Sequence, residues 1–220
     1  MKKKALIPVF VFASGRGSNF EALCQAVHAG KLNADIRALV SNTDGCGATE
    51  IARMFKVPVI AVSHKGCGRE QHEKKILEAL PQAERPWIVL AGYMRLLTKE
   101  FIERFWDSEL GVSRIVNIHP SLLPAFPGTS GYRQALEYGV KVTGATVHLV
   151  TTGLDDGPVV LQRSFEVRDD DTLEALLKRG LAVEHELYSE ALYKLFNHSW
   201  RLSRGSEGAG RPRVVFGGEA

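Results

Sequence analysis

The chain has 220 residues, of which 45% are hydrophobic and 24% are charged, and its formal net charge is +3 with a sequence pI near 8.8. This profile is typical of one globular domain with a sizeable core and excludes an extensively disordered chain. Because the lysines and arginines are spread out rather than gathered in one stripe, nucleic acid is not an expected partner. An anionic small molecule explains the modest positive charge equally well.

The cysteines and the start of the chain bear on where the protein works. Cys24, Cys46 and Cys67 make an odd number without metal-ligand spacing, so we expect no disulfide framework and a reducing compartment. The basic start and the apolar run after it superficially resemble a signal peptide. Pro8 and a Gly-rich turn directly after this run favour a first strand instead, and no later run is long enough to span a membrane. We therefore expect a cytoplasmic protein without a membrane partner.

Strands and helices are predicted to alternate along the first half of the chain. The apolar runs of strand length are apolar on both faces, which is the pattern of parallel strands covered by helices on each side. Strands are expected at Ala5–Phe12, Ile36–Ser41, Val57–Val62, Trp87–Ala91 and Arg114–Ile118, and helices at Asn19–Ala29, Gly47–Phe55, Arg69–Leu80 and Lys99–Trp106, the last with Thr98 as N-cap. This order predicts a doubly wound α/β fold, in which ligands bind outside the carboxyl ends of the strands.

The second half is predicted to add a short helix, two strands and a long final helix. The expected ranges are Tyr132–Tyr138 for the short helix, Val142–Val150 and Val159–Phe165 for the strands, and Asp171 or Thr172 to about Phe196 for the long helix. Glu174 would complete a capping box if Asp171 is the cap. The sequence thus predicts a mostly parallel sheet of about seven strands with helices on both faces. We expect a single catalytic domain over residues 1–200 and a mobile tail over residues 201–220.

The most informative motif is Asn117-Ile118-His119, at the end of a predicted buried strand. Side chains alternate across a strand, so Asn117 and His119 point to the same face while Ile118 packs on the other. A hydrogen-bond donor and a proton carrier therefore converge on one spot. Pro120 ends the strand because it has no N–H group. The alternative is a structural pair, in which His119 is a core histidine bonded to the backbone and Asn117 closes a turn.

A Gly-rich turn, residues 14–19, joins the first strand to a helix. The backbone at Gly17, the hydroxyl of Ser18, the amide of Asn19 and the helix N-terminus are suited to bind a phosphate group. The turn lacks the third glycine of a dinucleotide fingerprint and the Gly-Lys-Ser/Thr of a nucleoside triphosphate loop. An ordinary strand-to-helix turn is therefore the alternative.

Acidic residues in the second half suggest partners for His119. Asp155 would lie near His119 if the strands before them are neighbours, and a nearby carboxylate raises the pKa of an imidazole, which would make it an acid near neutral pH. Asp156 competes for this role, and both aspartates would also suit a turn. We interpret His148, on the preceding strand, as structural. No second set of metal-type ligands is present, so we expect no metal.

Two other features suggest a ligand. Glu184 falls on the apolar stripe of the last helix, where a buried carboxylate needs a cationic partner or ligand hydroxyls. The segment Ala91–Leu97 follows the fourth strand, and its apolar residues would contact a flat ring while Arg95 would meet a carboxylate. The alternatives are a structural ion pair at Glu184 and an ordinary strand-to-helix connection at Ala91–Leu97.

Five motifs occur in the order found in the phosphoribosylglycinamide formyltransferases (glycinamide ribonucleotide transformylases), and over residues 5–196 the chain resembles this group of the folate-dependent formyltransferase family. The motifs are Gly15–Asn19, Ala91–Leu97, Asn117–Pro124, Gly144–His148 and Leu154–Pro158. The central motif is shared with methionyl-tRNA formyltransferase and formyltetrahydrofolate deformylase. The first motif and the chain length favour the glycinamide group, because the tRNA enzyme normally carries an extra C-terminal domain and the deformylase an extra N-terminal regulatory domain.

The resemblance implies a formyltransferase fold with a Rossmann-like N-terminal half and a formyl transfer in de novo purine biosynthesis. The formyl group of the co-substrate 10-formyltetrahydrofolate would pass to the amine of N1-(5-phosphoribosyl)glycinamide, giving its N2-formyl derivative and tetrahydrofolate without a metal. Asn117 and protonated His119 would stabilise the oxyanion, His119 would move the proton and Asp155 would raise the pKa of His119. The alternatives are a stand-alone formyltetrahydrofolate deformylase, which uses water in place of the amine, and a non-catalytic folate- or nucleotide-binding module.

The resemblance also implies which residues hold the two small molecules. Gly17, Ser18 and Asn19 would bind the phosphate of the nucleotide, and Glu184 would bind its ribose. The folate would be held by Arg69, Met94, Arg95, Leu96, Leu97, Asn117, Thr151, Thr152, Gly153, Leu154 and Asp155. The Leu123–Pro124 bond is expected to be cis, and the protein to be a monomer or homodimer. Leu181 departs from the family, which often has a polar or basic residue one turn before the ribose-binding glutamate.

Overall fold

The structure is a computed structural model and describes residues 5–204 and 210–217. The chain divides into two compact units, Met1–Val116 and Asn117–Ala220. Strand β7 (Ile115–His119) begins at the end of the first unit and places its last three residues in the second.

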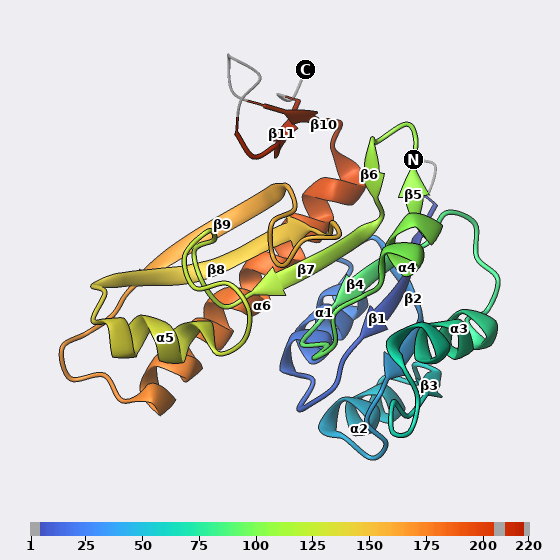
Figure 1. Cartoon of the computed structure of the whole chain (residues 1–220), viewed down its shortest axis with the longest axis horizontal. Coiled ribbons are helices and arrows are strands. Elements are labelled where there is room, and N and C mark those ends of the chain that lie inside the picture. Colours follow the sequence, from blue (N-terminus) through green and yellow to red (C-terminus); the bar gives the residue numbers. More distant parts are fainter. Residues whose placement is uncertain (1–4, 205–209, 218–220) are drawn as a thin grey trace. The chain divides into compact units, whose positions relative to one another are not determined.

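The first unit alternates strands and helices, as the sequence predicts (Figure 1). Its main elements are β1 (Ile7–Phe12), α1 (Ser18–His28), β2 (Ala34–Ser41), α2 (Gly47–Met54), β3 (Val59–Ala61), α3 (Arg69–Ala79), β4 (Trp87–Leu90) and α4 (Lys99–Arg104). β1 pairs in parallel with β2 and β4, and β2 pairs in parallel with β3. The strand order β3-β2-β1-β4 reverses at β1, so the carboxyl ends of β1 and β4 form the place where such sheets bind ligands.

The second unit is mixed and carries the longest helix. After β7 it contains α5 (Gly131–Tyr138), β8 (Val142–Leu149), β9 (Val159–Glu166), α6 (Leu173–Asn197), β10 (Trp200–Ser203) and β11 (Arg213–Phe216). β8 and β9 are antiparallel, β11 runs parallel to β9, and β10 is antiparallel to β11. α6 packs against β8, β9 and α5, as Figure 1 shows. The predicted α/β class is confirmed.

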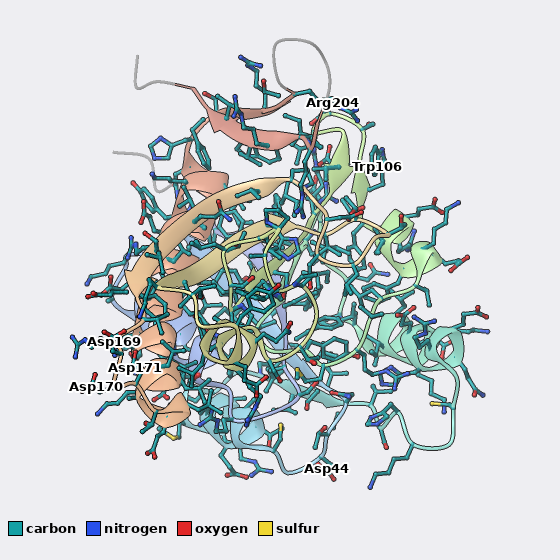
Figure 2. All side chains as sticks on the ribbon, turned by 60° about the vertical axis from the view of Figure 1, so that its left-hand side comes forward. Asp44, Trp106, Asp169, Asp170, Asp171 and Arg204 are labelled. Atoms are coloured by element: carbon teal, nitrogen blue, oxygen red, sulfur yellow. The ribbon has the colours of Figure 1, made fainter. Side chains whose placement is uncertain are left out.

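The beginnings of two helices follow local sequence signals. The Thr98 hydroxyl accepts a hydrogen bond from the Phe101 N–H at 3.2 Å and caps α4, as predicted. Of the two predicted caps of α6, the structure has Thr172, which accepts from the Ala175 N–H at 3.2 Å. Asp171 accepts from the Arg168 N–H at 2.8 Å instead. Figure 2 shows Asp169, Asp170 and Asp171 together at the N-terminal end of α6, where negative charge complements the helix dipole.

Helix α4 ends earlier than the predicted Trp106. Trp106–Asp107 form a short strand, β5, paired antiparallel with β6 (Val112–Ser113). Asp107 lies at the end of β5, and its carboxylate accepts from the N–H groups of Glu109 and Leu110 at 3.0 and 3.2 Å and pairs with Arg114. These bonds stabilise the turn that joins β5 to β6.

The C-terminal residues also differ from the expectation. The sequence predicts about seven strands and a mobile tail over residues 201–220, whereas β10 and β11 add two strands formed largely from that tail. Residues 205–209 and 218–220 lie outside the described residues, so the mobility of the tail stays a prediction. Among the described residues, no helix has both the length and the apolar character needed to cross a membrane.

Candidate active site

His119 lies at the end of β7 and is 3% exposed. Its Nε2 is 2.9 Å from the backbone carbonyl oxygen of Phe126. Since a carbonyl only accepts, Nε2 must carry a hydrogen, and Nδ1 is left to face another group. Phe126 reaches this position with φ +51°, an uncommon conformation for a residue with a side chain. The backbone bond expected for a structural histidine is therefore present, but it occupies one ring nitrogen.

Asp155 faces the other ring nitrogen of His119. Its Oδ2 is 3.4 Å from Nδ1 and accepts a hydrogen bond from the Gly128 N–H at 2.7 Å. The predicted proximity of Asp155 and His119 is thus confirmed. Asp156 is bonded to the Thr151 hydroxyl instead and closes its own loop. The 3.4 Å separation of Nδ1 and Oδ2 is longer than a charge-assisted hydrogen bond, which is typically about 2.7–2.9 Å. Such contacts in a ligand-free site often shorten when a ligand binds.

His148, interpreted from the sequence as structural, contacts the predicted catalytic residues. Its Nε2 is 3.1 Å from Asn117 Nδ2 and 3.7 Å from Asp155 Oδ1, and its Nδ1 is 3.1 Å from the Leu149 carbonyl oxygen. Burial lowers the pKa of His148 to about 4, although the Asp155 carboxylate opposes this change. The ring is therefore neutral near pH 7, with its hydrogen on Nδ1 and an acceptor at Nε2.

This arrangement fixes the amide of Asn117. Since Nε2 of neutral His148 accepts, the NH₂ group of Asn117 must point toward it. An amide NH₂ has two hydrogens, so the bond to His148 leaves the second one for a ligand. The sequence places His148 near the end of the neighbouring strand β8, but it does not give the register that brings His148 to Asn117.

Two features shape the loops around this cluster. The Leu123–Pro124 bond is cis, as the family resemblance implies. A Cβ added at Gly157 would lie 1.7 Å from the Leu149 carbonyl oxygen, the same oxygen that binds His148. A side chain at position 157 would therefore displace the backbone that holds His148.

Glu184 is buried on α6, as its place on the apolar stripe predicts, and Tyr132 of α5 lies near it. Burial raises the pKa of Tyr132 far above its usual value, and the charge of Glu184 raises it further. Gly180, one turn earlier, packs on the ring, because a Cβ there would lie 2.4 Å from Tyr132 Cζ. Tyr132 is therefore a neighbour of Glu184, the residue predicted to bind the ribose. This contact was not predicted from the sequence.

The predicted phosphate loop lies in the first unit between β1 and α1. Gly17 has φ +83°, and a Cβ there would lie 2.6 Å from the Cα of Ala48. A Cβ on Gly47 would lie 2.7 Å from the Arg16 carbonyl oxygen. These glycines let the N-termini of α1 and α2 pack together. The contact between the helices therefore requires a glycine at position 17, whether or not the turn binds a ligand. Ser18 and Asn19 begin α1, where N–H groups favour anions.

The predicted folate segment Met94–Leu97 follows β4 in the same unit. Ser14 lies two residues after β1. It accepts a hydrogen bond from the Met94 N–H at 2.9 Å and donates its own N–H to the Gly92 carbonyl at 3.1 Å, which holds the start of this connection. Met94 and Leu96 are 67% and 57% exposed and lie beside the strand-order reversal, where such sheets bind ligands. Arg69 is exposed at the start of α3.

The described residues of the two units thus hold separate groups of the predicted site. The second unit brings Asn117, His119 and Asp155 together with His148. Leu154, on the loop before Asp155, is 52% exposed. The first unit carries the phosphate loop and the folate segment on loops after β1 and β4. No group of three or more histidine, cysteine, aspartate or glutamate side chains in the described ranges has the arrangement of a metal site, and the expectation of a metal-free reaction stays a prediction.

Comparison with known proteins places this arrangement in a family. The family model described as formyl transferase matches residues 7–192. The chain belongs to the formyl transferase family. This confirms the resemblance drawn from the five motifs, and the match extends across both compact units.

Relatives within this family have two named activities. The phosphoribosylglycinamide formyltransferase of Bacillus subtilis is 39% identical over 186 residues, covering 84% of this chain and 92% of the relative. The formyltetrahydrofolate deformylase of Escherichia coli K12 is 40% identical over 166 residues, but the match spans only 56% of its length. A solved phosphoribosylglycinamide formyltransferase from Bacillus halodurans has a TM-score of 0.80 at 39% identity, covering 86% of this chain and 95% of that one. A solved Pseudomonas syringae deformylase has the same TM-score at 26% identity, covering 96% and 66%.

Proposed function

We propose that the protein transfers the formyl group of 10-formyltetrahydrofolate to the amine of N1-(5-phosphoribosyl)glycinamide. The observation that carries this proposal is the cluster of Asn117, His119 and Asp155, in which neighbouring groups fix the hydrogens of the amide and the imidazole. The Bacillus subtilis relative supports the choice of acceptor, because this chain matches 92% of its length. The products would be the N2-formyl derivative and tetrahydrofolate, as in a step of de novo purine biosynthesis.

The cluster would act on the charge that develops during transfer. The amine forms a bond to the formyl carbon, and the formyl oxygen becomes negative. The second N–H of Asn117 and the Nδ1–H of protonated His119 would donate to this oxygen. The bond from the carbon to the folate nitrogen then breaks, His119 passes its proton to that nitrogen, and the proton released by the amine restores the imidazolium. Asp155 would stabilise the positive charge on the ring throughout.

The binding roles follow the resemblance residue by residue. Gly17, Ser18 and Asn19 would bind the phosphate at the start of α1, and Glu184 would bind the ribose hydroxyls. Arg69, Met94 to Leu97, Asn117 and Thr151 to Asp155 would bind the folate. The exposed side chains of Met94 and Leu96 support the assignment of the first-unit segment, because an apolar ring would cover them.

The wider expectations form part of the same proposal. We propose that residues 1–200 act as one catalytic domain, because the family match runs over residues 7–192 without a break at the division between the units. The partners would be small molecules, the location cytoplasmic, and the protein a monomer or homodimer that needs no metal.

The competing function is a deformylase, favoured by the 40% identity to the Escherichia coli K12 enzyme. The two reactions share the formyl donor and differ in whether the attacking group is an amine or water. Loss of 10-formyltetrahydrofolate should be followed with and without N1-(5-phosphoribosyl)glycinamide. Consumption that needs the nucleotide supports the transferase, equal consumption without it supports the deformylase, and binding without consumption identifies a non-catalytic module.

A matched pair of variants ties the activity to the cluster. His119→Gln removes the proton carrier and should abolish most of the turnover. His28→Gln changes an exposed histidine at the end of α1 and should leave the rate unchanged. Equal rates for the two variants would refute the role of His119.

A further inference from the structure

Arg211 lies beyond the family match, which ends at residue 192, and binds the backbone of the loop that carries Asp155. Its Nη2 donates to the Asp155 carbonyl, and its Nε donates to the Gly157 carbonyl at 3.0 Å. We propose that Arg211 is a positioning residue that holds Asp155 in the orientation in which its carboxylate faces His119. This inference rests on the proposed formyl transfer for its kinetic consequences.

The loop needs such support because its backbone is unfavourable at the residue that matters. Asp155 has φ +48°, in the left-handed region that residues with a side chain rarely adopt. Residues 152–154 just before it are exposed and contribute little packing. The carboxylate of Asp155 is held by the Gly128 N–H, but the backbone conformation that directs it is held by the guanidinium. A rigid group with two donors fixes two carbonyls at once, which a single bond would not do.

Strand pairing explains why Arg211 reaches this loop. β11 runs parallel to β9, with Arg213 opposite Val159. Two residues earlier on each chain segment, the same register places Arg211 opposite Gly157, whose carbonyl it binds. β11 lies beside β10, which pairs with it from Trp200 to Ser203 (Figure 1). Val214 of β11 is buried. The position of Arg211 is therefore set by a paired strand.

The charges around Arg211 fit the same role. Burial lowers the pKa of Arg211, and the carboxylates of Asp156 and Asp155 oppose this change. Arg211 also contributes to lowering the pKa of His148, after the larger effects of burial and its other neighbours. The guanidinium thus belongs to the electrostatic surroundings of the catalytic cluster. An arginine that merely fastened the C-terminal strands would not need to lie there.

The kinetic test is a double-mutant cycle. Arg211→Ala should lower kcat by about tenfold to a hundredfold, because small displacements of a catalytic group have effects of this size. The KM for the nucleotide should change less than twofold. Arg211→Lys keeps the charge but not the paired donors, so its kcat should lie between those of wild type and Arg211→Ala. Arg213→Ala changes an exposed arginine at the start of β11, two residues after Arg211, and should behave as wild type. If Arg211 acts through Asp155, Arg211→Ala should have little further effect in an Asp155→Asn background.

A second measurement does not depend on activity. Amide hydrogen exchange of the peptide covering residues 151–157 should speed up at least severalfold in Arg211→Ala and stay unchanged in Arg213→Ala. Unchanged exchange, or fully additive losses of kcat in the double variant, would overturn the proposal. If wild type shows no nucleotide-dependent turnover, the proposed function fails, and the exchange rates still decide whether Arg211 holds the loop. If Arg211→Ala does not fold, kcat and the amide hydrogen exchange of residues 151–157 are measured on Arg211→Lys instead.

Discussion

The pH dependence of stability should reveal His148. In the folded protein its pKa is lowered to about 4, whereas the ordinary value for a histidine is 6.5. Between these values the unfolded chain binds a proton that the folded chain does not, so stability falls as the pH falls from about 6.5 to about 4. The contribution is fully present above pH 6.5. Each pKa unit corresponds to about 1.4 kcal/mol, so the total is roughly 3 kcal/mol, of which about 2 kcal/mol is lost by pH 5.

The physical cause is specific to the contacts of the ring. A second hydrogen on His148 would place a donor on Nε2 against the NH₂ group of Asn117. The charged groups around it are Asp155, which favours protonation, and His119 and Arg211, which oppose it. Burial outweighs the attraction of Asp155, so the neutral ring is retained near pH 7.

The assay compares wild type with His148→Gln by denaturant unfolding at pH 7 and pH 5. Glutamine does not titrate and keeps an acceptor for Asn117, so the variant should lose about 2 kcal/mol less than wild type between the two pH values. The comparison removes the effect of His72, whose pKa is also lowered by burial and which is present in both proteins. His28→Gln should reproduce the pH dependence of wild type. Identical losses in wild type and His148→Gln would refute a neutral buried His148.

Three other predictions test the site and its surroundings. Asp155→Ala should lower kcat at least about a hundredfold in the steady-state formyl-transfer assay, as should His119→Gln, and near-normal rates would remove the acid chemistry from this pair. Glu184→Ala should weaken binding of N1-(5-phosphoribosyl)glycinamide in calorimetric titration while folate binding is retained, and equal losses for both ligands would contradict a ribose contact. Gly180→Ala should destabilise the protein by about 1–2 kcal/mol in denaturant unfolding, because crowding against the buried ring of Tyr132 outweighs the better helix propensity of alanine. An unchanged or higher stability would show that the ring can move away.

Sequence patterns predicted the elements whose causes are local. Thr98 and Thr172 cap their helices because a hydroxyl before an amphipathic run is a local signal. The runs with apolar residues on both faces predicted the four parallel strands of the first unit. The proximity of Asp155 and His119 followed from placing both at strand ends, and this needed only the assumption that β7 and β8 are neighbours.

The contacts that could not be predicted depend on register or on backbone conformation. His148 meets Asn117 only because of the register between β7 and β8, which neither strand specifies alone. Phe126 offers its carbonyl to His119 from a positive φ that has no signature in its residue type. Arg211 lies in a Gly- and Arg-rich segment whose strands have four residues each, too short for a periodic pattern.

Two backbone carbonyls determine how the histidines of the cluster can work. The Phe126 carbonyl fixes the hydrogen of His119 on Nε2, so that Nδ1 faces Asp155, and the Leu149 carbonyl fixes the hydrogen of His148 on Nδ1, so that Nε2 accepts. Asp155 directs Oδ2 to the first ring and Oδ1 to the second, at 3.4 and 3.7 Å. Burial keeps His148 neutral, although the charge of Asp155 opposes this effect. Asp155 therefore lies against both histidine rings, while neutral His148 accepts a hydrogen bond from the Asn117 amide.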